Sequence, residues 1–302
     1  MTFDDILDAL DVTLEPFALC ELRGQASLGM GRRSHAVLHY ILAGEGRLAV
    51  DGVPPLPVRP GAVILVPAFA AHCLSSEGAR RGPLPDCRPL AMSLEHKRAG
   101  EGDGGLAAIC GRVRVVYRGL SGTLDLLRTP IVECLQAGDR VRAALDDLVS
   151  ELANPAVGSK ALARSLLLQC VILLFRRRLQ AGDQALGWLR GLGDESLWVP
   201  LQAILDHPQR DHTVQDLADL AAMSRACFAA RFREAYGAGP IELLRTVRLR
   251  RAAELLAATD LPVKRVASHV GYDSRSYFSR AFKAQHGVSP EAFRVAAAVA
   301  PG

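Results

Sequence analysis

The segment after Ser274 contains side chains that could bind nucleic acid. In a helix, where successive residues turn by about 100°, its donors share an arc of roughly 140°. These donors are Arg275, Ser276, Ser279, Arg280 and Lys283. Guanidinium groups donate paired hydrogen bonds to phosphates and to the O6/N7 edge of guanine. The opposite face carries Phe278 and Phe282. The pattern therefore predicts a helix that packs on one side and contacts a polyanion with the other.

The donor-bearing segment is the second copy of an internal repeat. The stretches LADLAAMSRACFAARFREAYG and VASHVGYDSRSYFSRAFKAQHG match at a spacing of 50 residues. The matched positions are Ser224/Ser274, Arg225/Arg275, Phe228/Phe278, Phe232/Phe282 and Gly237/Gly287. Upstream, Leu217 and Ala218 match Val266 and Ala267 at a spacing of 49. Each copy is predicted to be a short helix, a tight turn and a second helix with a serine N-cap.

The excess positive charge of the chain lies in the same region. The whole chain has 36 Lys or Arg and 32 Asp or Glu, a formal net charge of +4. Of these, 14 basic and 10 acidic residues fall at or after residue 200, which leaves 22 of each sign before it. The last third is therefore where a polyanionic partner is expected.

The motif ASHVGYDSRSYFSRAFKAQHGVSPEAFR resembles the signature of AraC/XylS-type transcription regulators, and the resemblance covers about the last third of the chain. In that family a long helix, here expected at 240–257, joins two helix-turn-helix units. The units place their recognition helices in successive major-groove segments about 34 Å apart. The resemblance implies that the partner is double-stranded promoter DNA.

The resemblance also implies which side chains face the bases. In the second unit they are Arg275, Ser276, Ser279 and Arg280, and in the first unit Arg225, Ala226, Ala229 and Ala230. Members of the family often carry Gln or Arg at the positions of Ala229 and Ala230. An alanine can contact only a thymine methyl group or permit close approach. The second unit is therefore predicted to supply more hydrogen-bond readout than the first.

The first 118 residues are predicted to be mostly β structure. Short apolar runs such as AVLHYILAG, GRLAVDG and GAVILVPA are separated by Gly and Pro at turn positions. Many short strands at close spacing indicate a sandwich or a small barrel. The stretch LHYILAGEGRLAVDG, with LPVRPGAVILVPAFAAHCL after it, resembles the cupin-type sensor domain found ahead of many such DNA-binding units.

The expected fold class is α+β with two domains. An N-terminal cupin-like β-barrel with a helical linker or dimerisation region precedes a C-terminal all-α domain of two helix-turn-helix units. The expected boundaries are 1–118 for the sensor domain, 119–195 for the helical region and 196–302 for the DNA-binding domain. The run LARSLLLQCVILLFRRRLQ predicts a long helix at 161–178, buried on more than one side. The family resemblance suggests that this helix forms a homodimer interface, and a core within one chain is the alternative.

The cupin resemblance points to three candidate metal ligands, His39, Glu45 and His72. The spacing from Gly61 through Pro67 to His72 matches the second cupin motif, and the spacing around His39 and Glu45 matches the first motif more loosely. Metal-binding cupins use imidazole and carboxylate ligands from facing strands. One histidine and one asparagine of the usual pattern are replaced here. A metal ion and a pocket without metal both remain open, and no other cofactor is expected.

Cys20 and Cys110 are candidates for a redox or effector site. Both lie in predicted strands and resemble two positions in a subgroup of the family that responds to reactive chlorine or other oxidants. A thiolate near a basic residue, here Arg23 or Arg112, is oxidised to sulfenic acid and captured by a second thiol. Cysteines are also among the most buried residues. A small-molecule effector and a sensor that is unliganded or bound to a partner therefore stay open.

Cys73 and Cys87 fall near predicted loops, and either could be the partner of a sensor thiol. The other three cysteines are predicted to be structural. Cys134 and Cys170 are expected in helical cores, and Cys227 is expected to be buried beside Phe228. The seven cysteines form no CxxC pair, which favours a reducing cytoplasm over a disulfide scaffold. The start, MTFDDILDAL, lacks the basic region of a secretory signal. We expect a cytoplasmic protein with no membrane partner.

Together these patterns predict a sequence-specific transcription regulator controlled by a signal in the cupin-like domain, with the roles of activator and repressor both open. The signal is either a small molecule or thiol oxidation. RNA polymerase and a second copy of the chain are further candidate partners. A cupin-type metal-dependent enzyme, or a metal-responsive regulator using His39, Glu45 and His72, is the alternative. An enzyme is not expected, because neither a complete metal triad nor a nucleophile with a partnered base is visible.

Overall fold

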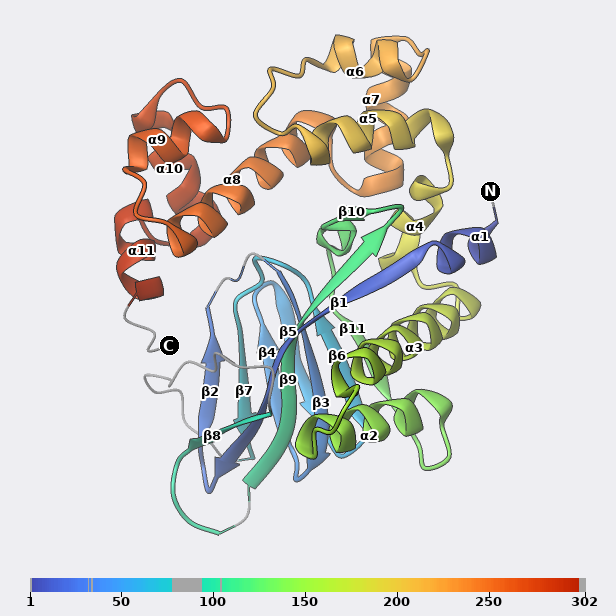
Figure 1. Cartoon of the computed structure of the whole chain (residues 1–302), viewed down its shortest axis with the longest axis vertical. Coiled ribbons are helices and arrows are strands. Elements are labelled where there is room, and N and C mark those ends of the chain that lie inside the picture. Colours follow the sequence, from blue (N-terminus) through green and yellow to red (C-terminus); the bar gives the residue numbers. More distant parts are fainter. Residues whose placement is uncertain (1, 32, 34, 78–93, 104, 299–302) are drawn as a thin grey trace. The chain divides into compact units, whose positions relative to one another are not determined.

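The computed structural model describes residues 2–31, 33, 35–77, 94–103 and 105–298. The chain divides into two compact units (Figure 1). The β-rich unit contains Leu10–Tyr117 and Thr123–Ala185. The helical unit contains Met1–Ala9, Arg118–Gly122 and Leu186–Gly302. The residues expected to form a separate region at 119–195 are thus shared between the two units.

The β-rich unit has two sheets. The larger has the order β11-β6-β3-β9-β1-β8, with β1 (Leu10–Arg23), β3 (Ala36–Ala43), β6 (Ala62–Val66), β8 (Glu95–Ala99), β9 (Gly105–Tyr117) and β11 (Ile131–Cys134). The smaller has the order β2-β7-β4-β5, with β2 (Ser27–Met30), β4 (Gly46–Val50), β5 (Val53–Val58) and β7 (His72–Ser76). The sequence of β5, VPPLPV, fits its place at the sheet edge. Proline has no backbone N–H to donate, so within sheets it is found mainly in edge strands.

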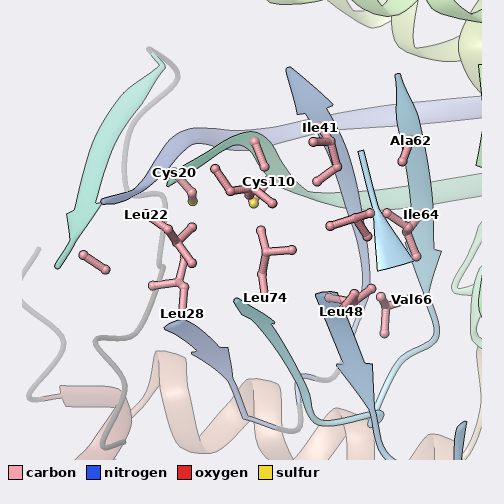
Figure 2. Close-up of a cluster of buried hydrophobic side chains, with 14 of the residues drawn as sticks. Cys20, Leu22, Leu28, Ile41, Leu48, Ala62, Ile64, Val66, Leu74 and Cys110 are labelled. Atoms are coloured by element: carbon pink, nitrogen blue, oxygen red, sulfur yellow. The ribbon is translucent and has the colours of Figure 1, made fainter. Parts of the chain in front are cut away.

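The two sheets enclose one apolar core, which confirms the predicted cupin-like architecture (Figure 2). Alternate residues of each strand face it, as the period of two requires. The larger sheet contributes Ala18, Cys20, Leu22, Ile41, Ala62, Ile64, Val66, Leu106, Ala108 and Cys110, and the smaller contributes Leu28, Leu48, Val50, Val58 and Leu74. Cys20 and Cys110 therefore belong to the core that joins the sheets.

Two helices, α2 (Arg140–Ala153) and α3 (Ser159–Gln180), pack against each other, and α3 contacts β1. The Tyr40 hydroxyl donates a hydrogen bond to Oδ1 of Asp146 at 2.6 Å and so fastens β3 to α2. Within one chain α3 buries a single stripe: Ala163, Leu167, Cys170, Val171, Leu174 and Phe175. The expectation that α3 is buried on more than one side is therefore not met by one chain alone, since Leu162 is 49% exposed.

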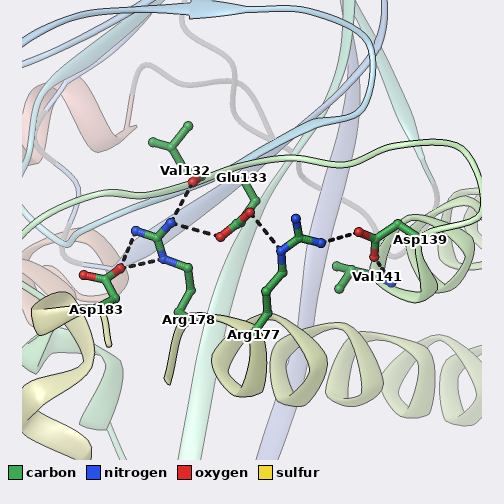
Figure 3. A network of polar contacts seen from close by, with 7 residues as sticks. All are labelled: Val132, Glu133, Asp139, Val141, Arg177, Arg178 and Asp183. Atoms are coloured by element: carbon green, nitrogen blue, oxygen red, sulfur yellow. Dashed lines mark hydrogen bonds and ion pairs between the residues drawn. The ribbon is translucent and has the colours of Figure 1, made fainter. Parts of the chain in front are cut away.

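An ion-pair network fixes the end of α3 (Figure 3). Arg177 Nε lies 3.1 Å from one Glu133 oxygen, and Arg178 Nη1 lies 2.9 Å from the other. Arg177 also pairs with Asp139, and Arg178 pairs with Asp183. The Glu133 side chain is only 11% exposed, so the network holds a half-buried carboxylate with two guanidinium groups.

Glu133 lies in β11, which the sequence-based prediction placed in a helical region. The segment IVEC pairs with β6 at the edge of the larger sheet instead. Cys134, expected in a helical core, is therefore an exposed strand residue, whereas Cys170 is buried as predicted. The error arose because four residues are too few for a strand period to compete with the surrounding helical pattern.

The helical unit begins with the chain's first helix. Its elements are α1 (Phe3–Asp8), β10 (Leu120–Ser121), α4 (Gly187–Leu192), α5 (Glu195–Asp206) and the helices described below. The Arg190 guanidinium lies 5.7 Å from the centre of the Phe3 ring, and Tyr236 donates a hydrogen bond to the Gly191 carbonyl at 2.8 Å. A side chain at Gly191 would meet the Tyr236 ring at 2.6 Å, so glycine is required there.

Candidate DNA interface and sensor site

The helical unit contains two helix-turn-helix pairs. The first pair is α6 (Val214–Leu220) with α7 (Arg225–Tyr236), and the second is α9 (Val263–His269) with α10 (Arg275–His286). The helix α8 (Pro240–Ala258) joins them, which confirms the linking helix expected at 240–257. The last helix of the described residues is α11 (Pro290–Ala298).

Matching caps define the two recognition helices. The Ser224 hydroxyl accepts a hydrogen bond from the backbone N–H of Cys227, and the Ser274 hydroxyl accepts one from Tyr277. Both serine N-caps were predicted, and each satisfies a backbone donor that the helix itself leaves unpaired. The turn is four residues long in the first pair and five in the second, which accounts for the change of spacing from 49 to 50.

The turns also differ in backbone strain. Gly271, in the second turn, has a φ of +83°. Ala222, at the matching position of the first turn, has a φ of +51°. This left-handed conformation is unstrained for glycine and costs roughly 1–2 kcal/mol for a residue with a Cβ atom.

Aromatic side chains form the packing face of each recognition helix. Phe228 and Phe232 in α7, and Phe278 and Phe282 in α10, have no exposed surface. The His286 ring stacks on Phe282 with ring centres 4.1 Å apart. This burial fixes the rotation of α7 and α10 and directs the other face of each helix outward.

The predicted contact residues lie on that outward face. In α7, Arg225, Ala226 and Ala230 are exposed and Ala229 is half-buried. In α10, Arg275, Ser276, Arg280 and Lys283 are exposed and Ser279 is half-buried. At the four matched base-facing positions the first helix offers one hydrogen-bonding side chain and the second offers four, so the asymmetry seen in the sequence persists on the surface.

Three further residues at this surface were missed or wrongly placed. Tyr277, which was not among the predicted contact residues, is 51% exposed beside Ser276. Cys227, expected to be buried, is exposed at the position of α7 that matches Tyr277. Glu291 Oε1 accepts from Arg275 Nη2 at 3.0 Å, which an inspection of α10 alone could not reveal. The signal for Glu291 was its position directly after Pro290, in the stretch that follows the repeat.

The sensor candidates Cys20 and Cys110 lie on neighbouring strands. In the antiparallel ladder of β1 and β9, Ala18 is opposite Cys110 and Cys20 is opposite Ala108. The cysteines are thus diagonal neighbours on one face, 0% and 2% exposed. Both are thiols, and Figure 2 shows their sulfur atoms in the core between the sheets. Cys110 is also directly opposite His39 of β3.

The nearest polar partner of Cys110 is an imidazole rather than an arginine. Its Sγ atom lies 3.1 Å from Nδ1 of His39. The His39 ring makes an edge-on contact with His72, with ring centres 5.0 Å apart. Burial, with a smaller contribution from His72, holds the pKa of His39 well below its usual range, so this imidazole is neutral. Burial also lowers the pKa of His72, whose Nδ1 lies 2.9 Å from the Ala70 carbonyl.

The three predicted metal ligands do not assemble. His39 and His72 meet inside the β-rich unit, but Glu45 is exposed in the turn between β3 and β4. In the described residues no group of three or more His, Cys, Asp or Glu could hold a metal ion. The ligand set of His39, Glu45 and His72 is therefore wrong, because the β3–β4 turn carries the carboxylate away from the interior.

A cupin-like domain followed by paired helix-turn-helix units defines a class of protein, the DNA-binding transcription regulators with a separate sensor domain. Two family models match: a cupin model over residues 2–180 and a helix-turn-helix domain model over residues 217–296. The chain belongs to the AraC family of transcription regulators. No helix among the described residues has the length and apolar character needed to cross a membrane.

Similar proteins support the same assignment. A putative AraC-like transcription regulator from Streptomyces lividans is 35% identical over 83% of this chain and 84% of its own length. The RCS-specific transcriptional activator RclR of Escherichia coli is 26% identical over 96% of this chain and 94% of its own. The fold resembles ToxT from Vibrio cholerae, with a TM-score of 0.53 at 13% identity over 94% of this chain and 95% of ToxT. These relatives are named as regulators, so the alternative of a cupin enzyme is set aside.

Proposed function

We propose that this DNA-binding regulator responds to oxidation of Cys110 and Cys20. The observation that carries the proposal is the contact of Cys110 Sγ with the neutral His39 ring, in the same core as Cys20. A neutral imidazole nitrogen can accept the thiol proton as the sulfur reacts. The similarity to RclR, which is named as specific for RCS, supports a redox signal for this chain as well.

The proposed reaction needs a small two-electron oxidant such as hypochlorous acid. The Cys110 thiol gives its proton to His39 as its sulfur attacks the chlorine; the O–Cl bond breaks, and the departing hydroxide takes the proton from His39 to form water. A water molecule then attacks the sulfur of the sulfenyl chloride, and chloride and a proton leave to give a sulfenic acid. The Cys20 thiol attacks that sulfur, an S–S bond forms, and the hydroxyl group leaves as water. Overall, two thiols and one hypochlorous acid give one disulfide, one water, one chloride ion and one proton.

Geometry couples this reaction to a change of shape. Diagonal neighbours in an antiparallel pair have Cα atoms about 7–8 Å apart. A disulfide requires about 4.4–6.8 Å. Joining the two cysteines therefore requires β1 and β9 to shift. The chain passes directly from Ala9 of the helical unit into β1, and from Tyr117 of β9 into Arg118 of the helical unit. A strand shift can thus act on the unit that carries the recognition helices.

Binding of the full chain to duplexes from its own upstream region tests the proposal. We expect hypochlorous acid to change binding by wild type and by Cys134→Ala, whose thiol is exposed and distant from the reaction. Cys20→Ala and Cys110→Ala should not respond, and the peptide joining Cys20 to Cys110 should be found by mass spectrometry only where both are present. If hypochlorous acid changed DNA binding by Cys20→Ala and by Cys110→Ala as much as by wild type, the redox proposal would be wrong.

A small-molecule effector is the second candidate. Nε2 of His39 and Nε2 of His72 are buried, and neither has a hydrogen-bond partner among the described residues. A buried polar atom without a hydrogen-bond partner destabilises the folded protein by about 1–3 kcal/mol. A polar ligand that bonds to these nitrogen atoms would remove this cost. Such a ligand would stabilise the β-rich unit without any change in the mass of Cys20 or Cys110, which distinguishes the two signals.

We also propose that the chain forms a homodimer through α3. The helix leaves Leu162 exposed and Leu166 and Leu173 half-buried along one edge of its buried stripe, where they widen its apolar surface. Replacement of Leu166 by lysine should convert a dimer to a monomer in sedimentation velocity, whereas Lys160→Ala should not. Contact with RNA polymerase stays a prediction.

A further inference from the structure

The two recognition helices begin with the same arginine but in different charge environments. Arg275 donates from Nη2 to Oε1 of Glu291 at 3.0 Å, and the two side chains are 60% and 52% exposed. Glu291 stands in the first turn of α11, and its contacts with its own backbone and with Arg275 lower its pKa, so it is ionised. Arg225 makes no ion pair with any residue of the described chain.

The internal repeat supplies the comparison. Pro240 begins α8 and Pro290 begins α11, at the same spacing of 50 that relates Arg225 to Arg275. The residue after Pro290 is Glu291, and the residue after Pro240 is Ile241, which is 42% exposed. At this matched position the second unit therefore has a carboxylate where the first unit has an aliphatic side chain.

A carboxylate at this position has two consequences for a DNA-facing guanidinium. It cancels most of the arginine's local charge and repels nearby phosphates, which lowers the sequence-independent part of binding. It also occupies one N–H of Arg275 and leaves other N–H groups of the same planar fork, which can still pair with guanine O6 and N7. An exposed ion pair is worth only about 0–1 kcal/mol, so it orients the side chain without preventing contact with DNA.

We infer that Glu291 is a specificity-determining residue, which holds Arg275 away from the phosphate backbone and directs it to a base edge. Arg225, whose unit has Ile241 at the position that matches Glu291, is instead available to phosphates. The first unit then supplies general affinity and the second supplies base selection. The inference deepens the assignment of α10 as a DNA-contacting helix and rests on it.

Two measurements on the full-length protein test this. The first is affinity for one fixed duplex of arbitrary sequence at several salt concentrations. The second is selection from a pool of randomised duplexes followed by sequencing. The variants are Glu291→Gln, which keeps the shape of the side chain, Arg275→Ala, and the matched control Ile241→Glu, which gives the first unit the missing carboxylate. Far-UV circular dichroism checks the fold of each variant.

Glu291→Gln should bind the arbitrary duplex about three- to fivefold more tightly, as expected when one charge no longer opposes a phosphate a few ångströms away. The slope of log K against log salt should steepen by about 0.9, the value of one added phosphate contact. The same variant should lose base preference at the position that Arg275→Ala also loses. Ile241→Glu should weaken binding to the arbitrary duplex and make the slope of log K against log salt less steep.

The outcomes distinguish failure of the role inferred for Glu291 from failure of the assignment of α10 as a base-selecting helix. If wild type selects no sequence from the pool, α10 does not select bases and the inference falls with that assignment. If wild type selects a sequence and Glu291→Gln selects it equally well with unchanged affinity, DNA readout stands and the role of Glu291 is overturned. Weaker binding of the arbitrary duplex by Glu291→Gln would also overturn it.

Discussion

His39 and Cys110 are opposite each other in the ladder of β3 and β9, with Nδ1 and Sγ 3.1 Å apart. Both side chains are inside the β-rich unit, and burial keeps the imidazole neutral. Protonation of the histidine or loss of the thiol proton would place a charge inside this core.

The β-rich unit should lose stability in acid. Burial lowers the pKa of His39 and of His72, and it lowers that of His35 to about 3, so all three are neutral in the folded state. The unfolded chain binds protons at these groups below their ordinary pKa of about 6.5. Stability is therefore fully present above pH 6.5 and falls below it, by up to about 1.4 kcal/mol per pH unit for each histidine.

Urea unfolding followed by circular dichroism between pH 7.5 and 5 measures this slope. His39→Phe should reduce it by about one proton. His269→Phe is the control, since its side chain is exposed in the helical unit. A free energy of unfolding that does not change over this range would contradict the assignment of the three neutral histidines.

The thiols should react in an order set by their burial. Cys134 and Cys227 are exposed and should be alkylated in the native protein. Cys20, Cys110 and Cys170 are buried and should be alkylated by iodoacetamide, which is larger than hypochlorous acid, only after unfolding. Burial also raises the pKa of the Cys170 thiol to about 12. Peptide mass spectrometry after brief iodoacetamide treatment measures the order. Added DNA should protect Cys227 on the outward face of α7 and leave Cys134 unchanged, and equal protection of both would contradict the proposed DNA face.

Ala222→Gly should stabilise the helical unit by about 0.5–1 kcal/mol, because glycine removes the strain of a φ of +51° and loses part of that gain to its greater freedom when unfolded. The reverse change, Gly271→Ala, should destabilise it, since the new Cβ atom would lie 2.7 Å from the Gln209 carbonyl oxygen. Both tryptophans of the chain, Trp188 and Trp198, are in this unit, so tryptophan fluorescence in urea reports its unfolding separately. A lower midpoint for Ala222→Gly would show that the turn is not strained.

Arg280→Ala should relax base selection more than Arg225→Ala does. Arg280 is exposed on a helix with four other candidate donors, whereas Arg225 stands among alanines. Loss of one bidentate contact with guanine should cost about 1–3 kcal/mol of discrimination, roughly 5- to 150-fold. Selection from a randomised duplex pool measures it. Loss of discrimination in Arg225→Ala with none in Arg280→Ala would be the opposite of this prediction.

The sequence by itself determined the helical half of the molecule. The repeat, the serine caps, the linking helix and the buried Phe228 and Phe278 follow from short-range patterns, since helix periodicity and capping involve residues only three or four apart. The strands that contain Cys20 and Cys110 were also predictable, because the alternation of a strand is a short-range pattern too. The short strand β11 and the exposure of Cys227 were not, because four residues or a single side chain give no period to measure.

Only the tertiary structure decided which of these residues meet. The register of β3 and β9 brings His39 into contact with Cys110, although the two are 71 residues apart in the sequence. The turn between β3 and β4 places Glu45 away from both histidines. The contact of Arg275 with Glu291 depends on the packing of α10 and α11, and no spacing within either helix encodes it. Side chains that act together come from distant segments, and their separation is set by register and packing, which local patterns do not contain.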